Sequence, residues 1–172
     1  MKLLLSVEKV DVNKANDNDG KTPFYIACEN GHVEIVKLLL NDERVDVNKV
    51  ELKDRTPLYI ACLEEQIEIV KLLLNDQRID VNQASNNEVT PFYVACSNGN
   101  IEILKLLLND KRVDINKANT NEVTPFYTAC YCGRIETINY YLMIIEKLIL
   151  INQIITVKQL FGFLVIMEKL KL

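Results

Sequence analysis

The sequence predicts an all-α solenoid of stacked helix–turn–helix units, because one seven-residue motif recurs at a fixed period. The motif at residues 22–28 returns at residues 56, 90 and 124, so that each step is 34 residues. A fixed period of about 20–50 residues is typical of proteins whose units stack on one another. Each motif is followed by apolar residues at helical spacing, which predicts a second helix in every unit.

The motif has the features of a helix start. Thr22 can take the N-cap position, where its hydroxyl accepts a hydrogen bond from an unpaired backbone N–H group. Pro23 then occupies the first helical position, where the N–H that proline lacks would have no partner. Asn30-Gly31 ends the helix, because glycine readily adopts the left-handed backbone that follows a helix end.

The second helix of the first unit is predicted over residues 33–40. Its apolar positions recur at helical spacing, while Glu34 and Lys37 face outward. Residues 42–48 are polar, with Val45 and Val47 alternating between polar neighbours, and they predict a turn or a short hairpin arm. Each unit is therefore helix, tight turn, helix and protruding loop.

The run from Gly20 to Leu40, followed by Val45-Asp-Val-Asn48, closely resembles an ankyrin repeat. The pattern recurs four times and covers about residues 3–142. The resemblance implies an ankyrin-repeat solenoid of about four repeats plus an N-terminal half repeat. The chain departs from the family in two ways: the period is one residue longer than the commonest ankyrin length, and tyrosine replaces the usual histidine at Tyr25, Tyr59, Tyr93 and Tyr127.

The repeat pattern divides the chain into an ankyrin repeat domain and a tail. Residues 3–13 match residues 38–48, which are the second half of a repeat, so we expect a fragment of a longer array. The expected segments are a half repeat at 1–16, repeats at about 17–50, 51–84, 85–118 and 119–142, and an apolar non-repeat tail at 143–172.

Repeat two departs most from the pattern. Asp54 replaces the loop glycine, and Glu65-Gln66 replaces Gly31-His32. A non-glycine residue in a left-handed turn costs about 1 kcal/mol. We therefore expect repeat two to be locally the weakest, while repeats three and four regain the turn glycine as Gly99 and Gly133.

The charge of the chain disfavours two classes of partner. The formal net charge is −4, and the tail contains four lysines and two glutamates, so the repeat region carries −6. Nucleic acids and anionic membranes are bound through clusters of Lys and Arg. We expect no nucleic acid partner, and the charge is compatible with a basic protein surface.

The five cysteines follow the repeat and predict free thiols. Cys28, Cys62, Cys96 and Cys130 fall at the same place in successive repeats, and neighbouring helices lie about 8–10 Å apart, too far for an unstrained disulfide. We expect these four to be small buried residues, and Cys132 to be exposed and reactive. Free thiols indicate a reducing, cytoplasmic compartment.

No residue cluster predicts catalysis. His32 is the only histidine and is expected to be a structural turn residue, because no nucleophile or orienting carboxylate lies at a matching spacing. The glutamates and aspartates that recur with the period are expected to lie on solvent-exposed helix faces and in loops. We expect no enzyme, cofactor, metal site or small-molecule substrate.

The tail leaves three interpretations open. It is very apolar, so it could form a terminal helix pair or, over Leu148–Met167, a membrane anchor. The anchor is disfavoured because Lys158 would lie near its centre, where a lysine costs about 2.5–3.5 kcal/mol. When the tail is translated back into codons and read in a shifted frame, the degenerate codons permit an ankyrin-like sequence. The third interpretation is therefore that the tail is a frameshifted fifth repeat.

The resemblance implies a protein–protein interaction scaffold, expected to be monomeric. Ankyrin proteins bind partners on the loop tips and the first-helix face; the residues of this chain at those positions are Lys21, Glu29, Asn30, Leu52, Lys53, Arg55, Leu63, Glu64, Val89, Ser97, Asn98, Val123 and Tyr131. Five of them are apolar at positions expected to face water, which indicates either a contact surface or scattered surface residues. The alternative functions are a membrane-tethered adaptor and a fragment of a larger multidomain protein.

Overall fold

The computed structural model describes residues 10–144 and 146. The chain divides into two units, residues 1–137 and 138–172, and the description below concerns the first unit unless stated otherwise. Most of the predicted half repeat and nearly all of the tail, including the anchor and frameshift hypotheses, lie outside the described residues.

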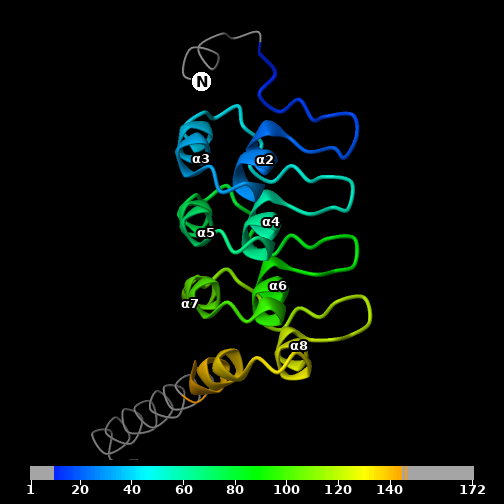
Figure 1. Ribbon diagram of the computed structural model, residues 1–172, viewed down its shortest axis with the longest axis vertical. Helices are drawn as coiled ribbons and strands as arrows, with labels where there is room; N and C mark the ends of the chain where they lie inside the picture. The colour runs from blue at the N-terminus through cyan, green and yellow to red at the C-terminus, as the bar shows by residue number, and fades with distance from the viewer. Residues whose placement is uncertain (1–9, 145, 147–172) are drawn as a thin grey trace, which may run out of the picture. The chain divides into compact units, whose positions relative to one another are not determined.

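The first unit is a stack of helix pairs (Figure 1). First helices pack on first helices, α2 on α4, α4 on α6 and α6 on α8, while α3 packs on α5 and α5 on α7. A further helix covers 135–144. The all-α solenoid predicted from the sequence is confirmed. The helices are α2 (Pro23–Glu29), α3 (Val33–Leu40), α4 (Pro57–Leu63), α5 (Ile67–Leu74), α6 (Pro91–Asn98), α7 (Ile101–Asn109) and α8 (Pro125–Tyr131).

The threonine of each motif caps its first helix as the sequence predicts. Thr22 Oγ1 accepts a hydrogen bond from Tyr25 N at 3.1 Å, and Thr56 Oγ1 accepts one from Tyr59 N at 3.0 Å. Thr90 and Thr124 cap α6 and α8 in the same way. Each cap satisfies one backbone donor that the helix itself leaves unpaired.

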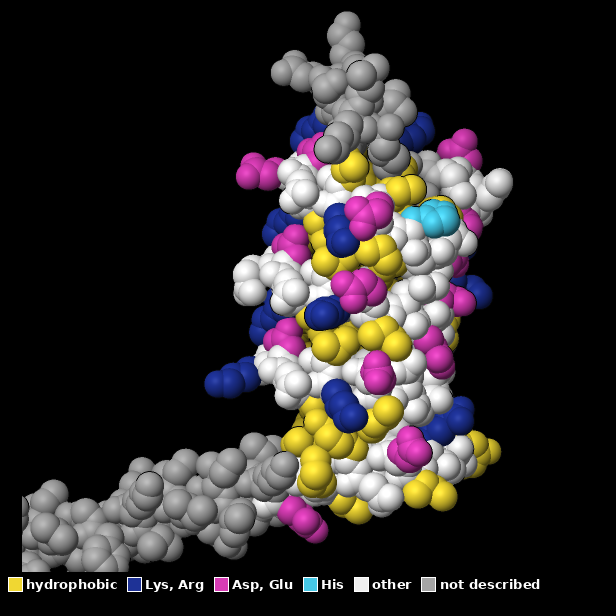
Figure 2. Space-filling model, turned by 60° about the vertical axis from the view of Figure 1, so that its left-hand side comes forward, with side chains coloured by type: hydrophobic (Ala, Val, Ile, Leu, Met, Phe, Trp, Pro, Cys, Tyr) yellow, Lys and Arg dark blue, Asp and Glu magenta, His cyan; other side chains and the backbone are white. Residues whose placement is uncertain are grey.

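The second helices bury one stripe and expose another. In α3, Val36 and Leu39 are buried, while Glu34 and Lys37 are exposed and form an ion pair of 2.8 Å. Figure 2 shows acidic and basic side chains interspersed along this side of the stack. An exposed i,i+3 pair contributes about 0.2–0.5 kcal/mol, so burial of the apolar stripe is what holds these helices in place.

The loop after each second helix contains turns and, within the described residues, no strand. An asparagine in the half repeat and in each of repeats one and two bridges to the next loop. In repeat one, Asn48 Nδ2 donates to Arg78 O at 2.7 Å, and Asp80 N donates to Asn48 Oδ1 at 2.9 Å. Asn13 and Asn82 make the same bridge. These pairs fix the register between neighbouring repeats.

Left-handed backbone occurs twice per repeat. Gly31, Gly99 and Gly133 occupy it after the first helix, and Glu65 does so in repeat two with φ 55°, as predicted. In the loop before the helix, Gly20 has φ 73° and Asp54 has φ 58°. Glu88 and Glu122, which were not predicted to be left-handed, occupy this loop position in repeats three and four with φ 58° and 60°.

The cysteines are all free, and three of them are buried as predicted. Cys28, Cys62 and Cys96 lie inside the stack, where burial raises the pKa of the Cys96 thiol to about 12. Cys132 is exposed, as expected. The expectation of a buried Cys130 is wrong: its helix α8 packs on α6, and within the described part of the first unit no first helix follows it.

No helix in the described ranges 10–144 and 146 is long and apolar enough to cross a membrane.

Candidate protein-binding face

The candidate binding face consists of the loop tips and the adjoining ends of the first helices. Backbone hydrogen bonds of 3.1 Å link the tips from repeat to repeat, with Leu52 N donating to Asp19 O and Asn86 N donating to Lys53 O. Thr120 N donates to Asn87 O in the same way. The tips therefore form a continuous row beside the first helices (Figure 1), so residues on successive tips belong to one surface.

The predicted site residues differ in exposure. Asn30, Leu52, Lys53, Glu64 and Tyr131 are exposed. The remaining predicted residues are half-buried: Lys21, Glu29, Arg55, Leu63, Val89, Ser97, Asn98 and Val123. The exposed set offers side chains that a partner can reach without displacing neighbouring residues.

Lys21 and Glu29 are tied to each other in repeat one. Lys21 Nζ lies 2.9 Å from Glu29 Oε1 and 3.3 Å from Asp19 Oδ2. The same ammonium group lies 5.7 Å from the centre of the Tyr25 ring. The hydrogen bond that Lys21 donates to Glu29 raises the pKa of Lys21 and so favours its charged form. These charges hold the loop against the helix and are less available to a partner than their sequence positions imply.

Arg55 pairs with a carboxylate that the sequence analysis did not single out. Arg55 Nε lies 2.9 Å from Oε1 of Glu51, whose side chain is 3% exposed. Glu51 Oε1 also accepts the backbone N–H of Lys53 at 2.9 Å. Burial alone would raise the pKa of Glu51, but the hydrogen bonds from Arg55 and the loop outweigh it and keep the pKa below its usual range. This pair shapes the loop of repeat two.

Ser97 and Asn98 contribute to the contacts between repeats. Asn98 Nδ2 donates to Leu63 O at 3.1 Å, and Arg134 Nε donates to Ser97 O at 2.8 Å. Gln66 Nε2 makes the corresponding bond to Glu29 O at 3.3 Å. The ends of the first helices are thus held by the following repeat.

Two of the five apolar site residues face water as expected. Leu52 is 72% exposed at a loop tip of repeat two, and Tyr131 is 81% exposed at the end of α8. The ring of Tyr131 stacks on Tyr127, with centroids 6.4 Å apart and an interplanar angle of 11°. Leu63, Val89 and Val123 are half-buried, so Leu52 and Tyr131 are the two of these five apolar residues that are exposed.

The motif tyrosines differ in their hydrogen bonding. The Tyr93 hydroxyl accepts from Thr128 Oγ1 at 2.5 Å and from Asn119 Nδ2 at 3.2 Å, which joins repeats three and four. The Tyr25 side chain is 0% exposed, and its hydroxyl has no hydrogen-bond partner within the described residues. Burial accordingly raises the pKa of Tyr25.

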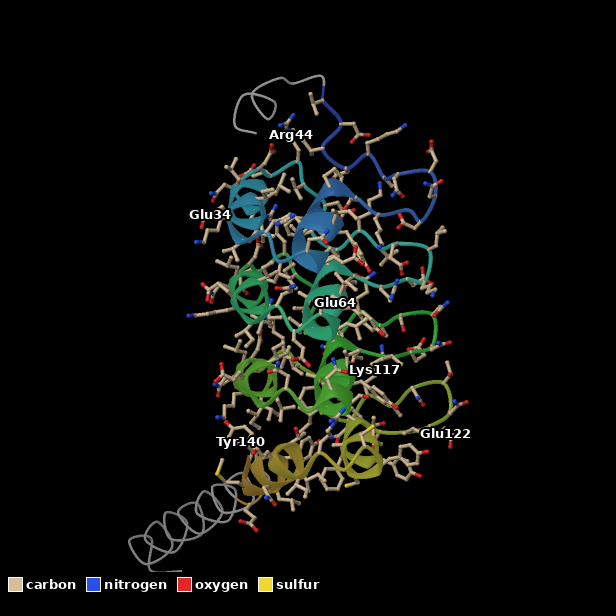
Figure 3. All side chains as sticks on the ribbon, viewed as in Figure 1. Glu34, Arg44, Glu64, Lys117, Glu122 and Tyr140 are labelled. Carbon is tan, nitrogen blue, oxygen red and sulfur yellow. The ribbon has the colours of Figure 1, made fainter. Side chains whose placement is uncertain are left out.

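Acidic loop residues are the part of the face that sequence reasoning missed. Asp54, Glu88 and Glu122 are exposed at the same loop position in successive repeats. Figure 3 shows Glu122 at the outer end of its loop and Glu34 on the opposite, second-helix side of the stack. Lys117 lies 3.5 Å from Glu88 and partly offsets its charge. Aligning the residue two before each motif threonine would have revealed this set.

A stack of paired helices with protruding loops defines a helical repeat protein. The family model "Ankyrin repeats (3 copies)" matches residues 1–85 and 79–152. The chain belongs to the ankyrin repeat family, whose members are generally protein–protein interaction modules. No curated protein sequence matches the chain significantly.

Proposed function

We propose that this protein is a non-catalytic protein–protein interaction scaffold that binds a partner through its loop tips and first-helix face. The five free cysteines support placing it in a reducing, cytoplasmic compartment.

The observation that carries the proposal is how the repeats differ from one another. Ala27, Ala61 and Ala95 are buried equivalents with the same side chain in every repeat. The residue three positions after each of these alanines is asparagine in repeats one and three (Asn30 and Asn98) and glutamate in repeat two (Glu64). Packing explains the constant positions, whereas the exposed Asn30 and Glu64 are free of that constraint and accessible to a partner.

Repeat two supplies the centre of the proposed surface. Leu52 and Lys53 are exposed at its loop tip, and Glu64 is exposed at the end of its first helix. The ion pair between buried Glu51 and half-buried Arg55 holds that loop in shape. An exposed leucine beside charges of both signs, on a pre-shaped loop, is suited to anchoring a protein partner of mixed polarity.

Affinity enrichment from the source cells, with quantitative mass spectrometry, tests the proposal. The altered protein carries Leu52→Lys, Glu64→Lys and Tyr131→Lys, all at exposed positions on the candidate face. A matched control carries Glu34→Lys, Glu68→Lys and Glu102→Lys at exposed positions of the second helices.

We expect the control protein to retain the partners of the native chain and the face variant to lose them. Circular dichroism melts verify that both variants stay folded. Partners retained equally by the face variant, or lost only by the control, would contradict the proposed face.

A further inference from the structure

The ends of the second helices α5 and α7 border a hollow of about 530 Å³. These two helices pack side by side, on the side of the stack away from the loop tips (Figure 1). The hollow, here called the basic hollow, is lined by Lys71 and Leu74 of α5, Gln77 after that helix, Leu106 of α7 and Lys111 after α7. It lies between repeats two and three, whose first helices also pack on α2 and α8, so it is an internal feature of the stack.

Two lysines of the basic hollow carry charges that the described part of the chain does not pair. Lys71 and Lys111 are both exposed, and neither forms an ion pair with a described residue. The contrast with repeat one is direct, because Lys37, the equivalent of Lys71, pairs with Glu34 at 2.8 Å. The ammonium groups of Lys71 and Lys111 are therefore available to a ligand.

The arginine of the basic hollow is already occupied. Arg112 Nη2 lies 2.6 Å from Asp110 Oδ2 and donates to Leu74 O, at the end of α5, at 2.9 Å. This contact offsets the negative charge of a carbonyl at a helix end, which would otherwise disfavour an anion there. With Arg112 and Asp110 balancing each other, the hollow keeps two positive charges, in a repeat region whose formal net charge is −6.

The positive charge of the hollow is particular to the junction of repeats two and three. Lys111 is preceded at the same place in the repeat by Gln77 and, in repeat one, by Glu43. All three side chains are exposed, so packing does not require a lysine here. The corresponding junction of repeats one and two carries Glu43 and Gln77 instead of Gln77 and Lys111.

We propose that the basic hollow binds an acidic segment of a protein partner. Carboxylates of the segment pair with Lys71 and Lys111, and an apolar side chain between them lies over Leu74 and Leu106, which are half-buried. Phosphate groups are bound best by the planar fork of a free arginine, whereas Arg112 is engaged, so carboxylates suit the two lysines better. This site is separate from the loop tips, so either proposal can fail without the other.

Charges on the preceding turns define the path of the segment. Glu68 of α5 and Glu102 of α7 are exposed beside the adjoining part of the groove between the two helices. They would repel carboxylates, so the acidic segment crosses the ends of the helices and does not run along them.

Fluorescence anisotropy of a labelled peptide, titrated with the full chain, tests the proposal. The peptide has two glutamates on each side of a leucine, and a second peptide has glutamines in their place. The altered protein carries Lys71→Glu and Lys111→Glu. A matched control carries Lys37→Glu and Lys53→Glu, which change the net charge equally at exposed positions outside the hollow.

We expect the native chain and the control to bind the acidic peptide, and the hollow variant to bind it more weakly by more than about tenfold, because two attractions become repulsions. Binding should also weaken at about 0.5 M salt, because exposed charges are then screened. Gln77→Lys adds a third cation to the hollow and should strengthen binding about threefold, a gain that partial unfolding could not produce. Circular dichroism melts verify the fold of every variant.

Three results would overturn the proposal. The first is a native chain that does not bind the acidic peptide, or binds the glutamine peptide equally well. The second is equal binding by the hollow variant and the control. The third is tighter binding of a single-stranded oligonucleotide than of the peptide, which would assign the hollow to phosphates and not to an acidic protein segment.

Discussion

Single residues in left-handed backbone determine where this stack is strained. Asp54, Glu65, Glu88 and Glu122 all have positive φ, and all four are acidic. Repeat two contains two of them, whereas repeats three and four contain one each. We therefore still expect repeat two to be locally the weakest. The backbone strain at Glu88 in repeat three and Glu122 in repeat four was not predicted from the sequence.

Replacing Glu65 with glycine should stabilise the protein. Glycine adopts φ near 55° without a steric penalty, so Glu65→Gly should add about 1 kcal/mol and raise the melting temperature by a few degrees. Glu64→Gly is the matched control, because Glu64 has φ −87° and glycine relieves no strain there. Thermal melts followed by circular dichroism measure both. An unchanged or lower melting temperature for Glu65→Gly would contradict the strain argument.

Cysteine reactivity should distinguish the end of the stack from its interior. Cys130 and Cys132 are exposed, whereas Cys28, Cys62 and Cys96 are buried and have raised thiol pKa values. The thiolate is the reactive form, so at pH 7.5 a maleimide should modify the first two rapidly and the other three only after unfolding. Peptide mass spectrometry identifies the modified sites. Rapid labelling of Cys62 in the native protein would argue against the stacked core.

Among the structural elements, the loop of repeat two depends on the ion pair between buried Glu51 and half-buried Arg55. Glu51→Gln removes the charge that Arg55 and the loop N–H groups satisfy, and it should cost about 2 kcal/mol at pH 7. Arg55→Gln should have a similar effect, since it leaves the buried carboxylate without its cation.

The contribution of Glu51 should also depend on pH. Because its folded-state pKa lies below the unfolded value, the stabilisation is present above the unfolded pKa, about 4.3, and is lost as the pH falls through the folded pKa. Urea unfolding at pH 7 and near pH 3 should therefore show a large difference between native and Glu51→Gln proteins at pH 7 and a smaller one at pH 3. An equal difference at both pH values would show that the charge is unimportant.

The asparagine bridges connect one repeat to the next. Asn82→Ala removes the hydrogen bond to Arg112 O and the acceptor of Asp114 N, and should lower the free energy of unfolding by about 1–3 kcal/mol. Asn116→Ala is the control, because the Asn116 side chain makes no such bridge in the described part of the chain. Urea unfolding measures both variants. Equal losses would mean that the bridge adds nothing beyond local loop structure.

At the scale of the whole molecule, local sequence signals predicted the architecture well. The Thr-Pro pair marks each first helix, and the period places each pair in register, so stacking follows from the sequence. The exposed Cys130 could not be predicted in the same way, because the period assigns it the environment of Cys28. This cysteine is buried only where the first helix of a following repeat packs against it, and the residues of one repeat do not show whether such a helix follows.

The sequence assigns candidate site residues by their position in the repeat, but it does not predict how accessible their side chains are. The family pattern places Lys21 and Arg55 on the binding face, yet each forms an ion pair that holds its own loop. Such pairs depend on how the loop folds back on the helix, which a linear pattern does not show. Leu52 and Tyr131 are exposed, and we propose that they contact the partner, as the pattern predicts.

Site-specific photo-crosslinking tests the proposed binding face most directly. A photoreactive phenylalanine analogue is placed at Leu52 on the loop tip in one protein, and at the exposed second-helix position Glu68 in another. Both proteins are irradiated in extracts of the source cells, and the adducts are identified by mass spectrometry. We predict a discrete protein adduct from position 52 and none from position 68. The same adduct from position 68 only, with nothing from position 52, would contradict a scaffold that binds through its loop tips and first helices.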